Sequence, residues 1–376
     1  MKIAVVVDGL ERGGTERQTL YMARELACRG WDVELIHYHK LCQDWEFDPS
    51  EFRVNKVTFL ARNKTVLRFF VRLYHHIKHN KYDVVYAVKS GPCIFGCLAA
   101  WLAGVRVILA GYRTPYQLHF PFRIAHRLVN AITTAWIVNS RYVAQSMSVA
   151  LSIRPEKFFV VNNGIDTQNF VSKLSHDEAK GRIGLSPQDS VVSIIGMLRP
   201  EKDHALFLEM GARLLKSRPQ TQFLLIGDGP LRSALESYAF CLGISHRVHF
   251  LGMRADIPDL LAATDVSVMA SQYEGLSNSI VESMSQGVPV VTTSYPGVEE
   301  VITNGREGFI VATRTPPDMA HAVRRILDDK NLRAHMGQHG RERVERQFSM
   351  SAMADAICAV FDAYTATVNG TACQSR

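Results

Sequence analysis

This chain of 376 residues lacks three features: cysteines spaced to bind a metal, an apolar run long enough to cross a membrane, and a low-complexity tract. The seven cysteines show no metal spacing, so we expect reduced thiols in a cytosolic protein. The most apolar window, 93–110, contains Gly104 and Arg106. It predicts a buried helix followed by a strand, because a membrane span needs about 20 apolar residues. No signal peptide is expected, since Lys2 leads straight into a strand.

Acidic residues are scarce in one stretch of the chain. Between Phe52 and Pro155 the only one is Asp83, while basic, aromatic and aliphatic residues interleave there. This pattern favours contact with an anionic membrane surface, reached from the cytoplasm at the inner face of the membrane. A merely solvated basic face is the alternative, and nucleic acid is not expected because no nucleic-acid-binding motif accompanies the charge. The basic residues are Arg53, Lys56, Arg62, Lys64, Arg68, Arg72, Lys78, Lys81, Lys89, Arg106, Arg113, Arg123, Arg127, Arg141 and Arg154.

The second half of the chain alternates apolar strands with helical patterns such as 204–216 and 231–241. Continuous apolar strands between helices predict a parallel sheet covered on both faces, whose ligands lie beyond the carboxyl ends of the strands. The expected strands are 191–197, 223–227, 248–251, 266–270, 288–292 and 308–311.

Candidate binding residues follow these strands. Arg199 and Lys202 follow the first strand and are cations suited to a diphosphate. Gly227 follows the second strand and Met253 the third. An ordinary tight turn is the alternative for any single loop, but five such loops at one sheet edge indicate a site.

The loop after the fourth strand, Ser271-Gln-Tyr-Glu-Gly-Leu-Ser-Asn-Ser-Ile-Val-Glu282, is the most informative. Small residues in a turn before a helix leave backbone N–H groups free for an anion. Glu282 lies about two helical turns further on, where its carboxylate could accept hydrogen bonds from sugar hydroxyls. This arrangement suits a sugar nucleotide. The candidate residues of the loop are Glu274, Gly275, Leu276, Ser277, Asn278 and Glu282.

These segments resemble, in the same order, the donor-binding motifs of the family-4 retaining glycosyltransferases. Residues 196–203 resemble "GRLxxEKG", with Met197 in place of the usual Arg, and residues 271–290 resemble "SxxEGxxxxxxEAMAxGxPV". Residues 223–230, 250–256 and 296–311 resemble the segments "LxIxGDGP", "FLGxxxD" and "GGxxExxxxGxxGxLV". The resemblance implies a GT-B fold, an α/β architecture in which two Rossmann-like domains face each other across a cleft.

The first half predicts a second α/β domain. A buried-strand pattern opens the chain, and Gly13 and Gly14 precede a helix over 18–28. They match the family's "GGxE" loop, which implies backbone contact with the donor phosphates. We expect an acceptor-binding domain over 1–172, a polar linker over 174–189, a donor-binding domain over 187–349, and a helix over 350–366 that crosses back to the first domain. The other expected strands are 33–38, 54–59, 83–88, 105–110, 136–139 and 158–161.

The acceptor side departs from the family. Many members carry His-x-His after the strand matched by 83–88, where this chain has Lys89, and a histidine near the next strand end, where it has Arg113. Neither cation is a base at neutral pH. His119 and His126 lie nearby in the sequence and are better explained as surface or packing residues.

The resemblance implies a retaining, metal-independent transferase that moves a sugar from a nucleotide diphosphate, UDP being the family's commonest, to a glycan or lipid-linked acceptor of surface-polysaccharide synthesis. Arg199 and Lys202 would bind the leaving diphosphate, Glu282 the ribose, and Glu274 the transferred sugar. No cofactor is expected. The alternatives are a sugar-nucleotide epimerase or a phosphorylase on the same architecture, and a non-catalytic scaffold that retains a nucleotide-sugar site.

Overall fold

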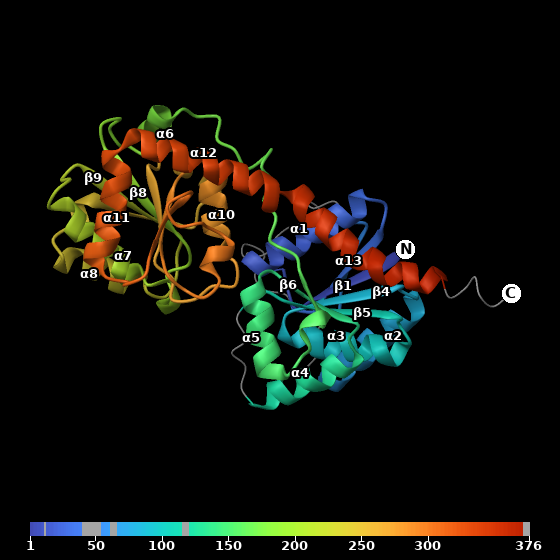
Figure 1. Cartoon of the computed structure of the whole chain (residues 1–376). Helices are drawn as coiled ribbons and strands as arrows, with labels where there is room; N and C mark the ends of the chain where they lie inside the picture. The colour runs from blue at the N-terminus through green and yellow to red at the C-terminus, as the bar shows by residue number, and fades with distance from the viewer. Residues whose placement is uncertain (11–12, 40–53, 61–65, 115–119, 371–376) are drawn as a thin grey trace. The chain divides into compact units, whose positions relative to one another are not determined.

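A computed structural model of the chain describes residues 1–10, 13–39, 54–60, 66–114 and 120–370 (Figure 1). The chain divides into two compact units, one of residues 1–164 and 350–376 and the other of residues 165–349. Both units are built on parallel sheets with helices packed against them, which confirms the predicted pair of Rossmann-like α/β domains. Residues 165–172, expected in the first domain, group with the second unit.

The first unit holds a seven-stranded sheet in the order β3-β2-β1-β4-β5-β6-β7, and its described pairings are all parallel. Its strands are β1 (Lys2–Val7), β2 (Asp32–His37), β3 (Lys56–Phe59), β4 (Val84–Val88), β5 (Val107–Tyr112), β6 (Ala135–Val138) and β7 (Phe158–Val160). Its helices are α1 (Gly14–Cys28), α2 (Val66–Asn80), α3 (Ser90–Ala103), α4 (Phe120–Ile132), α5 (Arg141–Leu151), the 3-10 turn η3 (Pro155–Lys157) and α13 (Met350–Gly370).

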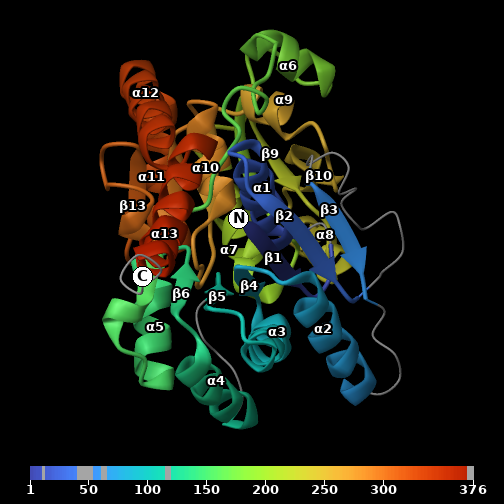
Figure 2. The same ribbon diagram turned by 90° about the vertical axis from the view of Figure 1, so that its right-hand side faces the viewer.

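Alternating residues of each central strand pack on opposite faces of this sheet. Ala4 and Val6 of β1 join a core with helices α2 to α5, whereas Ile3 and Val5 join a second core with α1 and α13. Cys93 and Cys97 are fully buried in the first of these cores. Helices α2, α3 and α4 pack side by side (Figure 2), and α13 packs on α1, so the last helix belongs to the first unit.

The second unit holds a six-stranded parallel sheet in the order β10-β9-β8-β11-β12-β13. Its strands are β8 (Ser190–Ile195), β9 (Thr221–Ile226), β10 (Val248–Gly252), β11 (Val266–Met269), β12 (Val290–Thr293) and β13 (Gly308–Val311). Its helices are α6 (His176–Arg182), α7 (His204–Leu215), α8 (Arg232–Cys241), α9 (Ile257–Ala262), α10 (Asn278–Ser285), α11 (Pro316–Asp328) and α12 (Lys330–Gln347), with 3-10 turns η4 (Pro200–Lys202), η5 (Ser245–Arg247) and η6 (Val298–Glu300).

Three helices differ by more than one residue from their sequence-based expectation, and one of them, α13, ends at Gly370 rather than at residue 366. Helix α1 begins at Gly14 rather than Gln18, because the extended backbone of Gly13 precedes it and Glu16 in its first turn complements the helix dipole. The expected linker contains helix α6, which a capping box starts: the Ser175 hydroxyl accepts a hydrogen bond from the Glu178 N–H, while the Glu178 carboxylate accepts one from the Ser175 N–H.

Candidate functional site

Three loops are joined by backbone hydrogen bonds at the carboxyl edge of the second sheet. The Gly227 N–H donates to the Gly252 carbonyl at 2.9 Å, and the Leu198 N–H donates to the Asp228 carbonyl at 3.0 Å. Gly227 has a φ of +136°, and a Cβ there would lie 2.1 Å from the Gly196 carbonyl oxygen. Only glycine fits this position, so Gly227 allows the loops after β8, β9 and β10 to close together.

Lys202 and Glu274 meet at this edge. The Lys202 ammonium forms an ion pair with Glu274 Oε1, and the Ser271 hydroxyl donates to the same oxygen at 2.9 Å. The Lys202 and Glu274 side chains are 23% and 16% exposed, so the pair is shielded yet reachable from solvent. The structure therefore brings together the cation and the carboxylate that the sequence assigned to the diphosphate and to the sugar.

The start of helix α10 completes this part of the edge. The Ser277 hydroxyl shares a hydrogen bond with the Ser279 hydroxyl at 3.1 Å and does not cap a backbone N–H of the first turn of the helix. The first N–H groups of a helix lack partners within the helix, so this end of α10 suits an anion. Asn278 opens the helix, and the Glu282 carboxylate lies one turn further on in a buried position.

Other predicted donor residues form no side-chain ion pair or hydrogen bond with the Lys202–Glu274 pair among the described residues, although the Lys202 N–H donates to the Arg199 carbonyl at 3.1 Å. Arg199 is exposed and has no ion pair within the described part of the chain, and Met253 is half exposed. Gly13 and Gly14 belong to the first unit. Their predicted contact with the donor phosphates stays a prediction.

Arg314 supports the site and carried no recognisable signal in the sequence. Its guanidinium donates to the Ser271 carbonyl at 2.7 Å and to Asp203 Oδ2 at 2.9 Å. Because Asp203 directly follows Lys202, Arg314 links the loop after β8 to the loop after β11. The contact therefore holds Lys202 and Glu274 close to each other.

Two buried aromatic side chains lie behind the pair. The Tyr295 hydroxyl has no hydrogen-bond partner among the described residues, and burial together with nearby Glu274 raises its pKa well above the usual value. Neither ring nitrogen of His204 has a partner there, and burial together with the Lys202 charge lowers its pKa to about 4. Tyr295 and His204 are therefore neutral at neutral pH and add no charge beside the Lys202–Glu274 pair.

The first unit presents different chemistry at its own carboxyl edge. Lys89, after β4, pairs with Glu16 and lies 3.3 Å from Asp8 Oδ1. Burial would lower the pKa of Lys89, but the two carboxylates outweigh it and raise the pKa above the usual value. Lys89 thus stays protonated at neutral pH. Arg113 follows β5 and donates to Asn163 Oδ1 at 2.6 Å.

His126, one of the two histidines considered from the sequence, does not supply a base here. His126 is fully buried on α4, bonds the Phe122 carbonyl at 2.8 Å and lies near the Trp136 ring, and burial lowers its pKa. It is a core residue. His119 lies outside the described residues, as do Arg12, Arg53, Arg62 and Lys64.

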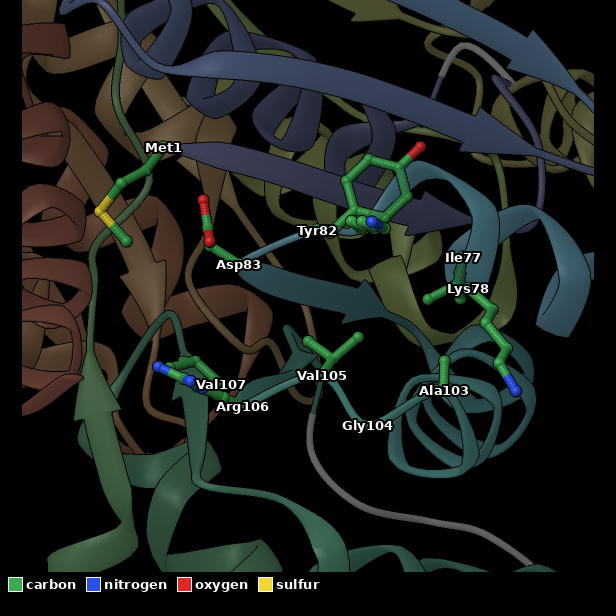
Figure 3. A pocket seen from close by; sticks show the side chains of 11 residues that line it. Met1, Ile77, Lys78, Tyr82, Asp83, Ala103, Gly104, Val105, Arg106 and Val107 are labelled. Atoms are coloured by element: carbon green, nitrogen blue, oxygen red, sulfur yellow. The ribbon is translucent and has the colours of Figure 1, made fainter. Parts of the chain in front are cut away.

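A cavity of about 350 Å³ lies elsewhere in the first unit (Figure 3). Lys78, Lys81, Asp83 and Arg106 are among its lining residues, at the amino ends of β4 and β5. Ligands of open parallel sheets bind beyond the opposite, carboxyl ends. We therefore place the candidate site at the carboxyl edges and not in this cavity. The described residues contain no cluster of three or more His, Cys, Asp or Glu side chains placed to hold a metal ion.

Two family patterns match the chain. "Glycosyl transferases group 1" matches residues 175–343, and "Glycosyltransferase Family 4" matches residues 12–169. The first match covers most of the second unit and the second covers most of the first unit.

Individual proteins are similar over almost the whole length. The lipopolysaccharide core biosynthesis glycosyltransferase LpsE of Rhizobium meliloti (strain 1021) is 30% identical over 353 residues, which cover 92% of this chain and 94% of LpsE. The UDP-Gal:alpha-D-GlcNAc-diphosphoundecaprenol alpha-1,3-galactosyltransferase of Escherichia coli is 26% identical over 368 residues, covering 92% of each chain. The crystal structure of Anabaena Alr3699/HepE in complex with UDP and glucose has a TM-score of 0.85 at 21% identity, covering 96% of this chain and 100% of that one.

Proposed function

This chain belongs to glycosyltransferase family 4, and from that premise we propose that it transfers a sugar from a UDP-sugar to a glycan or lipid-linked acceptor with retention of anomeric configuration. The reaction serves the synthesis of a surface polysaccharide or another glycoconjugate. The observation that carries the proposal is the Lys202–Glu274 pair at the carboxyl edge of the second sheet. The names of the E. coli and R. meliloti relatives support the UDP donor and the polysaccharide setting.

The donor occupies the carboxyl edge of the second unit. Lys202 and Arg199 bind the diphosphate as cations, and the backbone N–H groups from Gly275 to Asn278 add donors at the start of α10. Glu282 accepts hydrogen bonds from the ribose hydroxyls. Gly227 and Met253 lie beside the nucleotide, and the amides of Gly13 and Gly14 also contact the phosphates.

Catalysis depends mainly on stabilising the charges that develop on the diphosphate and on the sugar, and it needs no essential metal. The acceptor hydroxyl attacks the anomeric carbon on the face that the diphosphate leaves, the bond from that carbon to the diphosphate oxygen breaks, and a donor phosphate oxygen takes the hydroxyl proton. Lys202 and Arg199 stabilise the negative charge on the diphosphate. Glu274 stabilises the cationic character of the anomeric carbon. Since the phosphate receives the proton, the reaction needs no protein base.

Lys202 also links donor binding to the position of Glu274. In the free protein its ammonium is bound to the Glu274 carboxylate, so an arriving diphosphate competes with that carboxylate for the same cation. The Ser271 hydroxyl and Arg314 keep the glutamate loop in place during this exchange. Donor binding therefore frees a carboxylate oxygen of Glu274 toward the sugar.

The first unit contacts an anionic membrane surface through helices α2, α3 and α4. Leu67 on α2 and Leu128 on α4 are 72% and 68% exposed, and each has an exposed arginine next to it in the sequence, Arg68 after Leu67 and Arg127 before Leu128. Apolar side chains that insert among lipids and cations that meet lipid phosphates bind anionic membranes together. The exposed residues of this face are Leu67, Arg68, Val71, Arg72, Leu98, Trp101, Leu102, Phe122, Arg123, Ile124, Arg127 and Leu128.

A peripheral position at the inner face of the cytoplasmic membrane would give such a protein access to a lipid-linked acceptor. Among the described helices, none is long and apolar enough to cross a bilayer.

A nucleotide panel tests the donor. Purified protein is heated with UDP, GDP, ADP and their common sugar conjugates, because a ligand that binds the native state raises the melting temperature by mass action. We expect UDP and one UDP-sugar to raise it, and Arg199→Ala to reduce that rise. No rise with any nucleotide would contradict the proposal, and binding without turnover would favour a non-catalytic scaffold.

Vesicle flotation tests the membrane surface. We expect the protein to float with vesicles of phosphatidylglycerol and phosphatidylcholine, and not with phosphatidylcholine alone. The double change Leu67→Ser and Leu128→Ser should abolish flotation. Val149→Ser is the matched control, since Val149 is 79% exposed on α5 outside this face. Equal binding of both variants would refute the assignment.

A further inference from the structure

Arg113 is a buried cation without a counter-charge among the described residues. Only two lysine or arginine side chains are buried among the described residues, Arg113 at 7% exposed and Lys180 at 3%. Lys180 lies 3.5 Å from Asp265 Oδ2, whereas Arg113 forms no ion pair with any described residue. Burying an unpaired charge is costly. The protein therefore keeps Arg113 in a position that an anion would stabilise.

The guanidinium presents one free edge. Its Nη1 donates to Asn163 Oδ1 at 2.6 Å, which fixes the plane of the group. Among the described residues, its Nε and Nη2 are buried without a hydrogen-bond partner of normal geometry. These two nitrogens form the side of the guanidinium that binds a carboxylate or phosphate with two parallel hydrogen bonds.

Neighbouring side chains add two further unsatisfied polar atoms. Asn139 donates from Nδ2 to the Arg113 carbonyl at 3.0 Å, while its Oδ1 is buried without a partner. The Tyr86 hydroxyl is also buried without a partner of normal geometry. A Cβ at Gly111 would lie 2.6 Å from the Tyr86 hydroxyl oxygen, so that hydroxyl lies against the end of β5, two residues before Arg113. Burial raises the pKa of Tyr86, and the Arg113 charge opposes that rise. The set offers N–H donors, one hydroxyl and one acceptor oxygen.

The position of the group points to substrate rather than to folding alone. Arg113 follows β5 and Asn139 follows β6, so both lie at the carboxyl edge of the first sheet, where open parallel sheets bind ligands. Lys89, another cation at that edge, is paired with Asp8 and Glu16. Arg113 lacks a carboxylate partner among the described residues, so an anion entering there would meet its uncompensated positive charge.

We infer that Arg113, Tyr86 and Asn139 form a binding site for an acidic sugar group of the acceptor, a carboxylate or a phosphate ester with a hydroxyl beside it. Arg113 Nε and Nη2 donate to two oxygens of the anion. Tyr86 donates to one of them, and Asn139 Oδ1 accepts from the neighbouring sugar hydroxyl. Its assignment to the acceptor rests on the proposed function, in which the first unit receives the acceptor.

The test uses the full chain labelled with ¹⁵N in its arginine side chains. Glucuronate and glucose 1-phosphate serve as the anionic probes and glucose as the neutral probe. We expect the Arg113 Nε–H resonance, identified by its loss in Arg113→Gln, to shift on titration with at least one anion and not with glucose. Arg113→Gln should weaken binding of that anion by about tenfold or more, measured by the remaining shifts. Arg113→Lys keeps the positive charge but loses the two parallel N–H donors of the guanidinium, so this variant should bind the anion with intermediate affinity.

Arg106→Gln is the matched control, because exposed Arg106 precedes the same strand that Arg113 follows. It should change the anion affinity by less than about twofold. A shift with glucuronate alone identifies a carboxylate site, and a shift with glucose 1-phosphate alone identifies a phosphate site. The inference is overturned if neither anion moves the Arg113 resonance, if glucose moves it equally, or if Arg106→Gln loses as much affinity as Arg113→Gln.

Titration of the same samples with UDP separates this site from the donor site. Arg113→Gln should bind UDP with unchanged affinity while losing the anion. If the wild-type chain binds the anion at Arg113 but binds no nucleotide, the proposed transferase function fails and the Arg113 site stands.

Discussion

The substitutions Lys202→Met and Glu274→Gln each remove one charge of the same ion pair, and we expect them to have different effects on UDP binding. A hydrogen bond to a charged group contributes about 1.5–3 kcal/mol, and each 1.4 kcal/mol is about a tenfold change in affinity. If Lys202 binds the diphosphate, its loss should raise the Kd for UDP by about tenfold to a hundredfold. Glu274, in contrast, competes with the diphosphate for that lysine.

Neutralising Glu274 frees the ammonium. Glu274→Gln should therefore leave the Kd for UDP unchanged or lower, while kcat falls by about a hundredfold or more through lost stabilisation of the anomeric carbon. Both side chains are partly exposed, so losing the pair should cost only about 1 kcal/mol of folding stability. Folding therefore does not obscure the comparison.

Isothermal titration calorimetry with UDP and steady-state kinetics with a UDP-sugar measure the two effects. Lys216→Met is the matched control, because Lys216 is exposed at the end of α7 in the same unit. Its Kd and kcat should equal those of the wild type. If Glu274→Gln weakens UDP binding as much as Lys202→Met does, the separate roles given to the two residues are wrong.

Three further predictions concern stability. Gly227→Ala should destabilise the chain by about 3 kcal/mol or more in urea unfolding, because its Cβ would meet the Gly196 carbonyl and its φ of +136° disfavours a side chain. The pKa of His204 is about 4 in the folded chain and about 6.5 in the unfolded chain, so the unfolded chain binds more protons between these pH values. The free energy of unfolding should therefore fall by about 3 kcal/mol as the pH drops from 6.5 to 4, and this fall should be smaller in His204→Asn. Burial would raise the pKa of Glu34, but hydrogen bonds, chiefly from His76, hold that pKa well below its usual range. The free energy of unfolding should therefore fall further as the pH drops below about 5, and Glu34→Gln should reduce this loss in acid-unfolding curves.

The sequence predicts the sheets well because buried parallel strands are read from continuous apolar runs. The strand over 308–311 has the predicted bounds, and the run after Gly104 is a strand as expected, although it begins and ends two residues later than predicted. Helix starts were harder to predict. Gly13 and Gly14 suggest a turn, yet helix α1 begins within that segment.

The site was predictable where one loop carries several functional groups. Glu274, Ser277 and Glu282 share a single segment, and although their spacing alone would also fit a solvated helix face, the other loops at the same sheet edge and the family motif indicate a site. Arg314 was not predictable, because it contacts Ser271 across 43 residues of sequence and follows a different strand. Only the fold brings such residues together.

The same limit applies to Arg113. The sequence marks it as a cation where relatives often carry a histidine, but its burial and the absence of a carboxylate partner among the described residues are properties of the folded unit. These properties carry the inference of an anion site.

The most direct test of the central claim is to identify the products formed from a UDP-sugar and a synthetic polyprenyl-diphosphate sugar. The account predicts equimolar UDP and a new glycoside whose anomeric proton has the small coupling constant of an α linkage, matching the α-linked donor. A β-linked product, or no UDP release from any UDP-sugar by folded protein on vesicles, would contradict it.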